Sequence, residues 1–240
     1  MSLRGYRLAS RALASTGGER RAGLVGPGGE FRDYRPYQPG DDPRHVDWNV
    51  YARSGRLVTR QFHAEQSARV YLSVDVSASM TPRQAATRTV STFLRQFARS
   101  DAWKERELPG LTAGLTTLAN EPSGLVIVVS DGLEHLDGLR GALWALATRG
   151  FDLSFIELLS RADLHPPAGD WTLKDVETGE SLDVDDEARR YYLRALDRHQ
   201  DALAKLVRGV GFRFTRLLDD ARSPAVWTAL RRAGIVVKGG

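Results

Sequence analysis

Four residues in two short stretches of this sequence could together hold a metal ion. Asp75, Ser77 and Ser79 alternate directly after one apolar run, and Asp131 directly follows a second. One carboxylate and two hydroxyls offer the oxygen ligands that suit Mg²⁺, which usually keeps water at its other coordination positions. Serines near a helix start also commonly bond the free amides of its first turn. The residues alone leave both interpretations open.

The two apolar runs predict the strands that would position these residues. Residues 70–75 and 124–130 are rich in apolar and β-branched side chains, which is typical of parallel strands covered on both faces. Ligands of open α/β sheets bind beyond the carboxyl ends of such strands. We therefore expect Asp75 and Asp131 to lie at a common rim of the sheet.

A helix is predicted directly after the serines. Thr81 and Gln84 have the spacing of a capping box, and Pro82 suits the first helical position. With Thr81 as the N-cap, the helix is expected to run to about Arg99. This arrangement weakens the capping interpretation of the two serines without removing it.

The remaining elements alternate as βαβ units, which indicates an α/β fold with right-handed crossovers. Helices are expected at 111–118, 136–149, 186–208 and 224–233, and strands at 151–158 and 211–218. The segment 171–184 has two alternating arms around Thr178 and Gly179, so it predicts an inserted β-hairpin.

Three parts of the chain are distinguished. Residues 1–27 are expected to be flexible or helical, and residues 28–69 to form a block packed on a core domain of residues 70–240. In the block we predict one helix from Asp42 to about Arg53 and a strand over 56–63. Mixed charges close in sequence usually tie a loop down, so a structural role is favoured over a catalytic one. The expected contacts are ion pairs of Arg35, Arg44 and Arg53 with Asp41, Asp42 and Asp47, with Tyr37 and Trp48 packed underneath.

Composition excludes several classes of protein. The 240 residues are 42% hydrophobic and contain no cysteine, so disulfides, thiolate catalysis and cysteine-based zinc sites are excluded. No run resembles a membrane span or a signal peptide, and a cytoplasmic protein is expected. Residues 1–69 hold twelve arginines against seven acidic residues, but no lysine run or array of stacking aromatics accompanies them. We therefore do not expect nucleic-acid binding.

Two resemblances follow from these motifs. Asp75-x-Ser77-x-Ser79, with a later Ser-Asp-Gly at 130–132, resembles von Willebrand factor A domains and their metal-ion-dependent adhesion site (MIDAS). More narrowly, GGEFRDYRPYQPGDDPRHVDWNVYAR followed by DVSASM, and later DVETGESLDV, resembles the short, soluble form of the bacterial DUF58 family. This resemblance covers the chain from about Gly28 to the C-terminus.

The resemblance implies a Rossmann-like von Willebrand factor A-type domain with a central, mostly parallel sheet. It implies that Asp75, Ser77, Ser79 and Asp131 hold Mg²⁺ or Mn²⁺, directly or through water, and that an acidic group of a partner protein completes the coordination. Such proteins are often encoded beside a MoxR-type AAA ATPase and are proposed to assemble or activate other proteins. The family has no established enzymatic activity.

This sequence departs from the family pattern in two places. Pro109 stands where a threonine ligand is expected, so Thr112 could replace it only if the loop shifts by about a turn of helix. The segment 101–108 is also short, so the sheet is expected to be shortened at one edge. Either the strand at 56–63 covers that edge, or a homodimer forms through it, because bare edges are liabilities.

The expected function is a noncatalytic, cation-dependent module that binds an acidic group on a protein partner. A metal-dependent hydrolase is an alternative, but haloacid-dehalogenase-type phosphatases need a second acid where Ser77 stands. Neither a G-x-S-x-G elbow nor a Walker lysine loop is present. A scaffold with a degenerate, metal-free site is the other alternative, because ligands without their supporting residues bind weakly.

Overall fold

The computed structural model describes residues 6–10, 31–62, 69–97, 103–174, 179 and 181–238. The chain divides into two compact units, a smaller one of residues 16–67 and a larger one formed by residues 1–15 and 68–240. The larger unit contains all the candidate ligands. None of the helices in the described ranges is long and apolar enough to cross a bilayer.

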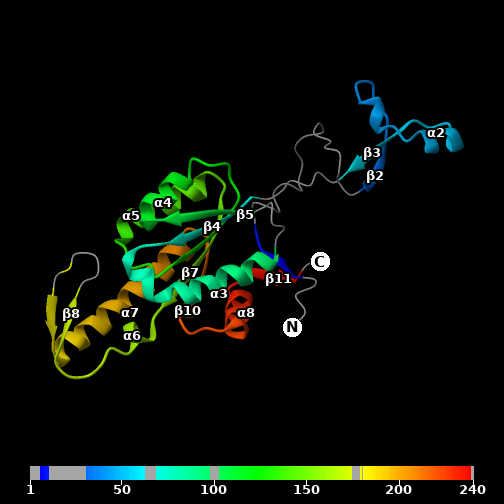
Figure 1. Ribbon diagram of the computed structural model, residues 1–240. Coiled ribbons are helices and arrows are strands. Elements are labelled where there is room, and N and C mark those ends of the chain that lie inside the picture. The colour runs from blue at the N-terminus through cyan, green and yellow to red at the C-terminus, as the bar shows by residue number, and fades with distance from the viewer. Residues whose placement is uncertain are drawn as a thin grey trace. The chain divides into compact units, whose positions relative to one another are not determined.

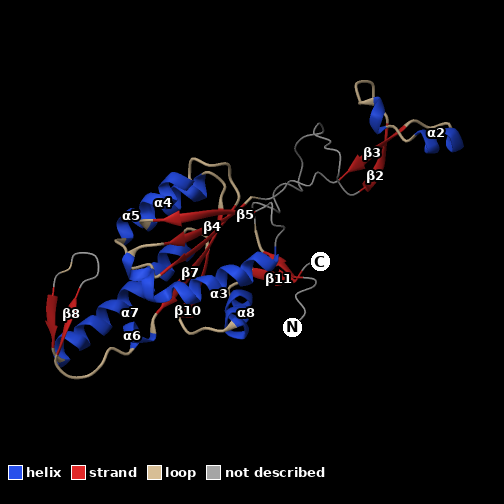
Figure 2. Ribbon diagram, in the orientation of Figure 1, coloured by secondary structure: helices blue, strands red, loops and turns tan. Residues whose placement is uncertain are grey.

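A five-stranded, all-parallel sheet forms the centre of the larger unit (Figures 1 and 2). Its strands are β4 (Val70–Asp75), β5 (Trp103–Leu108), β6 (Leu125–Ser130), β7 (Asp152–Leu159) and β10 (Arg213–Leu218). Their order is β10-β7-β6-β4-β5, so the chain moves outward from β4 to β5 and then returns to the other side of β4. Ligands of doubly wound sheets bind where the strand order reverses, which here is between β4 and β6. The predicted α/β architecture with a central parallel sheet is confirmed.

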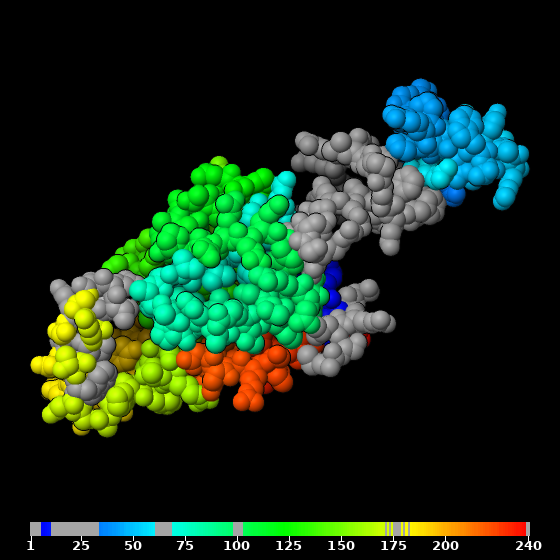
Figure 3. All heavy atoms as spheres, viewed as in Figure 1, coloured from blue at the N-terminus to red at the C-terminus, as the bar shows by residue number. Residues whose placement is uncertain are grey.

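Helices cover both faces of this sheet (Figure 1). One face packs against α4 (Leu111–Leu118), α5 (Leu136–Thr148) and α7 (Asp186–Gly209), and the other against α3 (Gln84–Leu94) and α8 (Ser223–Arg232). The last two lie at the surface of the face shown in Figure 3. The described part of this unit also contains the short helices η3 (Ala78–Arg83), η4 (Arg95–Phe97) and α6 (Arg161–Leu164). Strands β6 and β7 at the centre are fully buried because each face of the sheet has its own apolar core.

Most predicted helices and strands of this unit are confirmed to within two residues. The predicted hairpin is also confirmed, as β8 (Trp171–Lys174) pairs antiparallel with β9 (Ser181–Val184), although Thr178 lies outside the described residues. The expectation that the N-terminal residues are flexible or helical is wrong for residues 6–8. They form strand β1 (Tyr6–Leu8), which pairs with β11 (Val236–Lys238). That pairing buries Leu8 against a segment at the opposite end of the sequence, a contact that local patterns do not reveal.

The sheet edge beside β4 is occupied by β5, a strand that we did not predict. The strand that we expected at 56–63 is present as β3 (Val58–Phe62), which pairs with β2 (Phe31–Pro36) in a separate two-stranded sheet of the smaller unit. The exposed residues 104–107 of β5 are all charged. Charged side chains on an edge strand discourage pairing with another chain. The homodimer through this edge stays a prediction, and the exposed charges of β5 argue against it.

In the described residues of the smaller unit, 31–62, the β2–β3 pair is joined by two short helices. The single helix predicted from Asp42 is two, η2 (Pro43–His45) and α2 (Trp48–Ser54). Asp42 caps η2, and the Asp47 carboxylate accepts the amides that begin α2. The backbone of Val46 is extended, so η2 ends there before Asp47 begins α2.

The predicted ion pairs of this unit are partly confirmed. Asp41 pairs with Arg35 and Asp42 with Arg44, as expected. Asp47 pairs instead with Arg60, at 3.2 Å, because the bridge between Val46 and Thr59 places Asp47 beside β3. The prediction that Trp48 packs underneath is wrong, since this residue is 58% exposed.

Candidate metal centre

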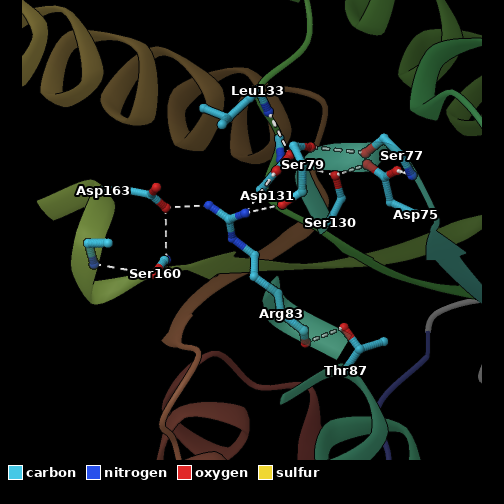
Figure 4. A network of polar contacts seen from close by, with 12 residues as sticks. Asp75, Ser77, Ser79, Arg83, Thr87, Ser130, Asp131, Leu133, Ser160 and Asp163 are labelled. Carbon is cyan, nitrogen blue, oxygen red and sulfur yellow. Dashed lines mark hydrogen bonds and ion pairs between the residues drawn. The ribbon is translucent and has the colours of Figure 1, made fainter. Parts of the chain in front are cut away.

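Asp75 ends β4, and the turn after it gathers both predicted serines (Figure 4). The Asp75 Oδ1 atom accepts a hydrogen bond of 2.9 Å from the Ser77 amide. The hydroxyl oxygens of Ser77 and Ser79 lie 3.0 Å apart. The tight turn therefore places two hydroxyls together next to one carboxylate.

The predicted capping box after these serines is wrong. Thr81 lies inside η3, and the N-cap of α3 is Arg83, which makes no side-chain capping bond. The chain continues from the serines as a 3-10 turn through Pro82, so the α-helix begins later than expected. Ser77 stands at the N-cap of η3 but also makes no side-chain capping bond, which removes that alternative role for its hydroxyl.

Ser130 connects the two aspartate loops across the point where the strand order reverses. Its hydroxyl donates to Asp75 Oδ2 at 2.6 Å and accepts the Gly132 amide at 3.0 Å. The Asp131 Oδ1 atom accepts the Leu133 amide at 3.2 Å. Buried hydrogen bonds of this kind fix both carboxylates in position.

Arg83 provides a positive charge inside the same network. It is 4% exposed, and its Nη1 atom lies 3.6 Å from Asp131 Oδ2. Nη1 also donates to the Ser79 carbonyl oxygen, and Nη2 donates to Asp163 Oδ2 (Figure 4). Asp163 follows β7, so this network joins the loops after three neighbouring strands.

Thr112, the expected replacement for the missing threonine, belongs to a separate contact. Its hydroxyl and its amide both donate to Glu134 Oε2, the amide at 2.8 Å. Glu134 lies in the same loop as Asp131. The described contacts therefore join Thr112 to the rim through Glu134 and not to the two serines.

The donor set suits a hard cation that keeps water. Octahedral ligands about 2.1 Å from Mg²⁺ lie about 3 Å from their neighbours, which matches the separation of the two serine hydroxyls. Asp131 Oδ2 is buried, and nothing in the described part of the chain donates a hydrogen bond to it. No cluster of three or more histidine, aspartate or glutamate side chains in the described ranges could hold a metal. A cation here would therefore need the two serine hydroxyls and water in addition to the carboxylates of Asp75 and Asp131.

A buried acid extends the polar row along the sheet. Ser130 aligns with Glu157 on β7, and Glu157 aligns and pairs with Arg216 on β10. Burial raises the pKa of the Glu157 carboxyl above its usual range, although the bond from Arg216 opposes this shift. His199 on α7 also lowers this pKa, and its Nε2 lies 2.8 Å from the Gly132 carbonyl oxygen.

Substitution of this acid should change how stability depends on pH. A raised pKa in the folded state means that Glu157 stabilises the fold at low pH, and that this contribution is lost as pH rises from about 4.5 through the folded pKa. Glu157→Gln removes the ionisation, so the free energy of unfolding of the variant relative to the native protein should increase over that window. Urea unfolding at pH 4 and pH 7 measures this difference, and an unchanged difference would contradict the pKa shift.

Sequence reasoning missed two charged members of this site. Arg83 was not singled out because it lay inside the predicted helix, although it stands one turn after Ser79. Asp163 also follows a parallel strand, β7, and that position was the available signal. Ser130 lies within the Ser-Asp-Gly motif, but its bridging hydroxyl depends on the pairing of β4 with β6.

The fold and the site define an α/β protein of the doubly wound class, with a buried polar centre at the reversal of its strand order. The chain belongs to the DUF58 family, described as a protein family of unknown function, whose model matches residues 33–91 and 80–202. The uncharacterized proteins Rv1480 of Mycobacterium tuberculosis and Mb1516 of Mycobacterium bovis are each 29% identical to it, in an alignment that covers 79% of this chain and 74% of theirs. An aerotolerance-related membrane protein from Bacteroides fragilis aligns with a TM-score of 0.39 at 13% identity, over 69% of this chain and 98% of that one.

Proposed function

We propose that this chain is a noncatalytic protein-binding module of the von Willebrand factor A type. Asp75, Ser77, Ser79 and Asp131 would hold Mg²⁺ or Mn²⁺, and the cation would bind an acidic group of a partner protein. A divalent cation that is held by few anionic ligands attracts a further carboxylate strongly. A MoxR-type AAA ATPase is the proposed associate in the assembly or activation of other proteins.

The observation that carries this proposal is the set of oxygens at the rim. Two hydroxyls lie 3.0 Å apart beside Asp75, and the buried Asp131 Oδ2 lacks a hydrogen-bond donor among the described residues. A buried carboxylate oxygen without a donor is costly unless a cation compensates it. These features support a hard cation more directly than any other ligand.

Two exposed apolar side chains at the rim support a protein partner. Val76 stands between Asp75 and Ser77 and is 46% exposed, and Leu133 stands two residues after Asp131 and is 47% exposed. Apolar side chains that surround a polar anchor are typical of protein interfaces. A partner segment would therefore place an acidic residue on the cation and apolar residues beside it.

Removal and return of the metal should change the stability of the native protein. A ligand that binds only the folded state raises the melting temperature, by about 5 to 10 °C at a hundred times its dissociation constant. Chelator-treated protein should show this rise with Mg²⁺ or Mn²⁺, and Asp75→Ala should lose it. Asp201→Ala, at an exposed position of α7, is the matched control and should keep it. The absence of a rise in the native protein would sink the cation-dependent function.

One observation favours a second candidate, a metal-independent scaffold. The buried guanidinium of Arg83 already places a positive charge 3.6 Å from Asp131 Oδ2. If this charge suffices to balance the carboxylate, the module would bind its partner without a cation. In that case the melting experiment gives no rise in either protein.

A further inference from the structure

We propose that Arg83 competes with the cation for Asp131 and thereby sets how tightly the site holds a divalent ion. This inference rests on the proposed function for the identity of the site. It assigns to Arg83 a role that neither its position in the sequence nor the comparisons provide.

The guanidinium is held in place from several sides. Nη1 donates to the Ser79 carbonyl oxygen, and Nη2 donates to the carboxylate of Asp163. The Asp163 carboxylate is itself fixed, because it also accepts the Ser160 amide at 2.9 Å in the capping box of α6. Arg83 therefore cannot move away from the rim without breaking buried contacts.

The charge of Arg83 acts on Asp131 Oδ2, the proposed ligand atom that accepts no hydrogen bond from the described residues. Nη1 lies 3.6 Å from Asp131 Oδ2, beyond normal hydrogen-bond distance, so charge dominates this contact. Like charges near a buried site repel much more strongly than they do in water. A divalent cation bound at Asp131 would be repelled by the guanidinium, and it would have to share the charge of the same carboxylate.

Asp163 determines how strongly Arg83 competes. It draws the guanidinium away from Asp131 and neutralises part of its charge. Loss of the Asp163 charge should therefore strengthen the hold of Arg83 on Asp131 and weaken cation binding. Loss of the Arg83 charge should strengthen cation binding. The two substitutions thus have opposite expected signs, although both break the same ion pair.

The test is a titration of chelator-treated, full-length protein with Mn²⁺, in which free Mn²⁺ is followed by electron paramagnetic resonance. Arg83→Gln should bind Mn²⁺ at least about tenfold more tightly than the native protein. Arg83→Lys keeps the charge and should stay within about twofold, and Asp163→Asn should bind several-fold more weakly. A merely structural role for Arg83 would not produce tighter binding in a less stable variant.

Each outcome decides the proposal. The proposal is overturned if Arg83→Gln binds Mn²⁺ no more tightly than Arg83→Lys does. It is also overturned if Asp163→Asn binds Mn²⁺ as tightly as the native protein does. If Arg83→Gln does not fold, the affinity of Asp163→Asn alone decides. Binding by Arg83→Gln but not by the native protein supports the competition and rejects the cation-dependent function. Absence of binding in every protein rejects both.

Discussion

Gly132→Ala is expected to lower the free energy of unfolding by about 3 kcal/mol and to abolish the Mg²⁺-dependent rise in melting temperature. Gly132 has a φ of 68°, where a side chain is strained, and an added Cβ would lie 2.4 Å from Leu203 Cδ2 on α7. Leu203 is fully buried, so it cannot move aside without disturbing the core. The strain would displace the turn that fixes Ser130 and Asp131.

Urea unfolding and thermal melts with and without Mg²⁺ measure both effects. The matched control is Gly141→Ala on α5, where an added Cβ meets nothing within 4 Å and φ is ordinary. That substitution should stabilise the protein by up to about 1 kcal/mol, because alanine favours a helix over glycine. A Gly132→Ala protein that keeps its full response to Mg²⁺ would show that this turn does not position the ligands.

The sequence predicted the strands that have a clear local pattern of apolar residues, and it missed the strands that depend on a partner elsewhere in the chain. Strands β4, β6 and β7 are continuous buried runs, and their apolar composition suffices to identify them. Strand β5 was missed because residues 104–107 are all charged and lie exposed at the sheet edge. Strand β1 was missed because its partner lies at the other end of the chain. An edge strand owes its structure to the neighbour that it pairs with, which a local pattern does not reveal.

The candidate site was predicted in part for a similar reason. Parallel strands bring their carboxyl ends to one rim, so strand assignment alone placed Asp75 beside the loop that holds Asp131, where Ser130 donates to Asp75 Oδ2. The role of Arg83 could not follow, because the direction of its side chain depends on where η3 ends and on the position of α6. The contact of Thr112 with Glu134 likewise depends on how the start of α4 packs against the loop after β6.

Gly124→Ala should destabilise the larger unit by about 2 to 3 kcal/mol while leaving the cation response intact. Gly124 directly precedes β6, at the end of the sheet opposite to the site, and an added Cβ would lie 2.4 Å from the carbonyl oxygen of Arg69. That oxygen accepts the Leu125 amide at 2.9 Å. A backbone atom cannot rotate away as a side chain can, so the start of β4 would have to separate from β6.

The two glycine substitutions therefore separate stability from site geometry. Gly124→Ala should melt at a temperature about 5 to 10 °C lower than the native protein, yet its melting temperature should rise with Mg²⁺ by the same amount as that of the native protein. Gly132→Ala should lose both stability and the rise of its melting temperature with Mg²⁺. If Gly124→Ala also lost its response to Mg²⁺, cation binding would depend on the stability of the whole sheet, and the local positioning by Ser130 and Gly132 would be rejected. If it kept both its stability and its response, the close contact with the Arg69 carbonyl could be relieved by a small backbone shift.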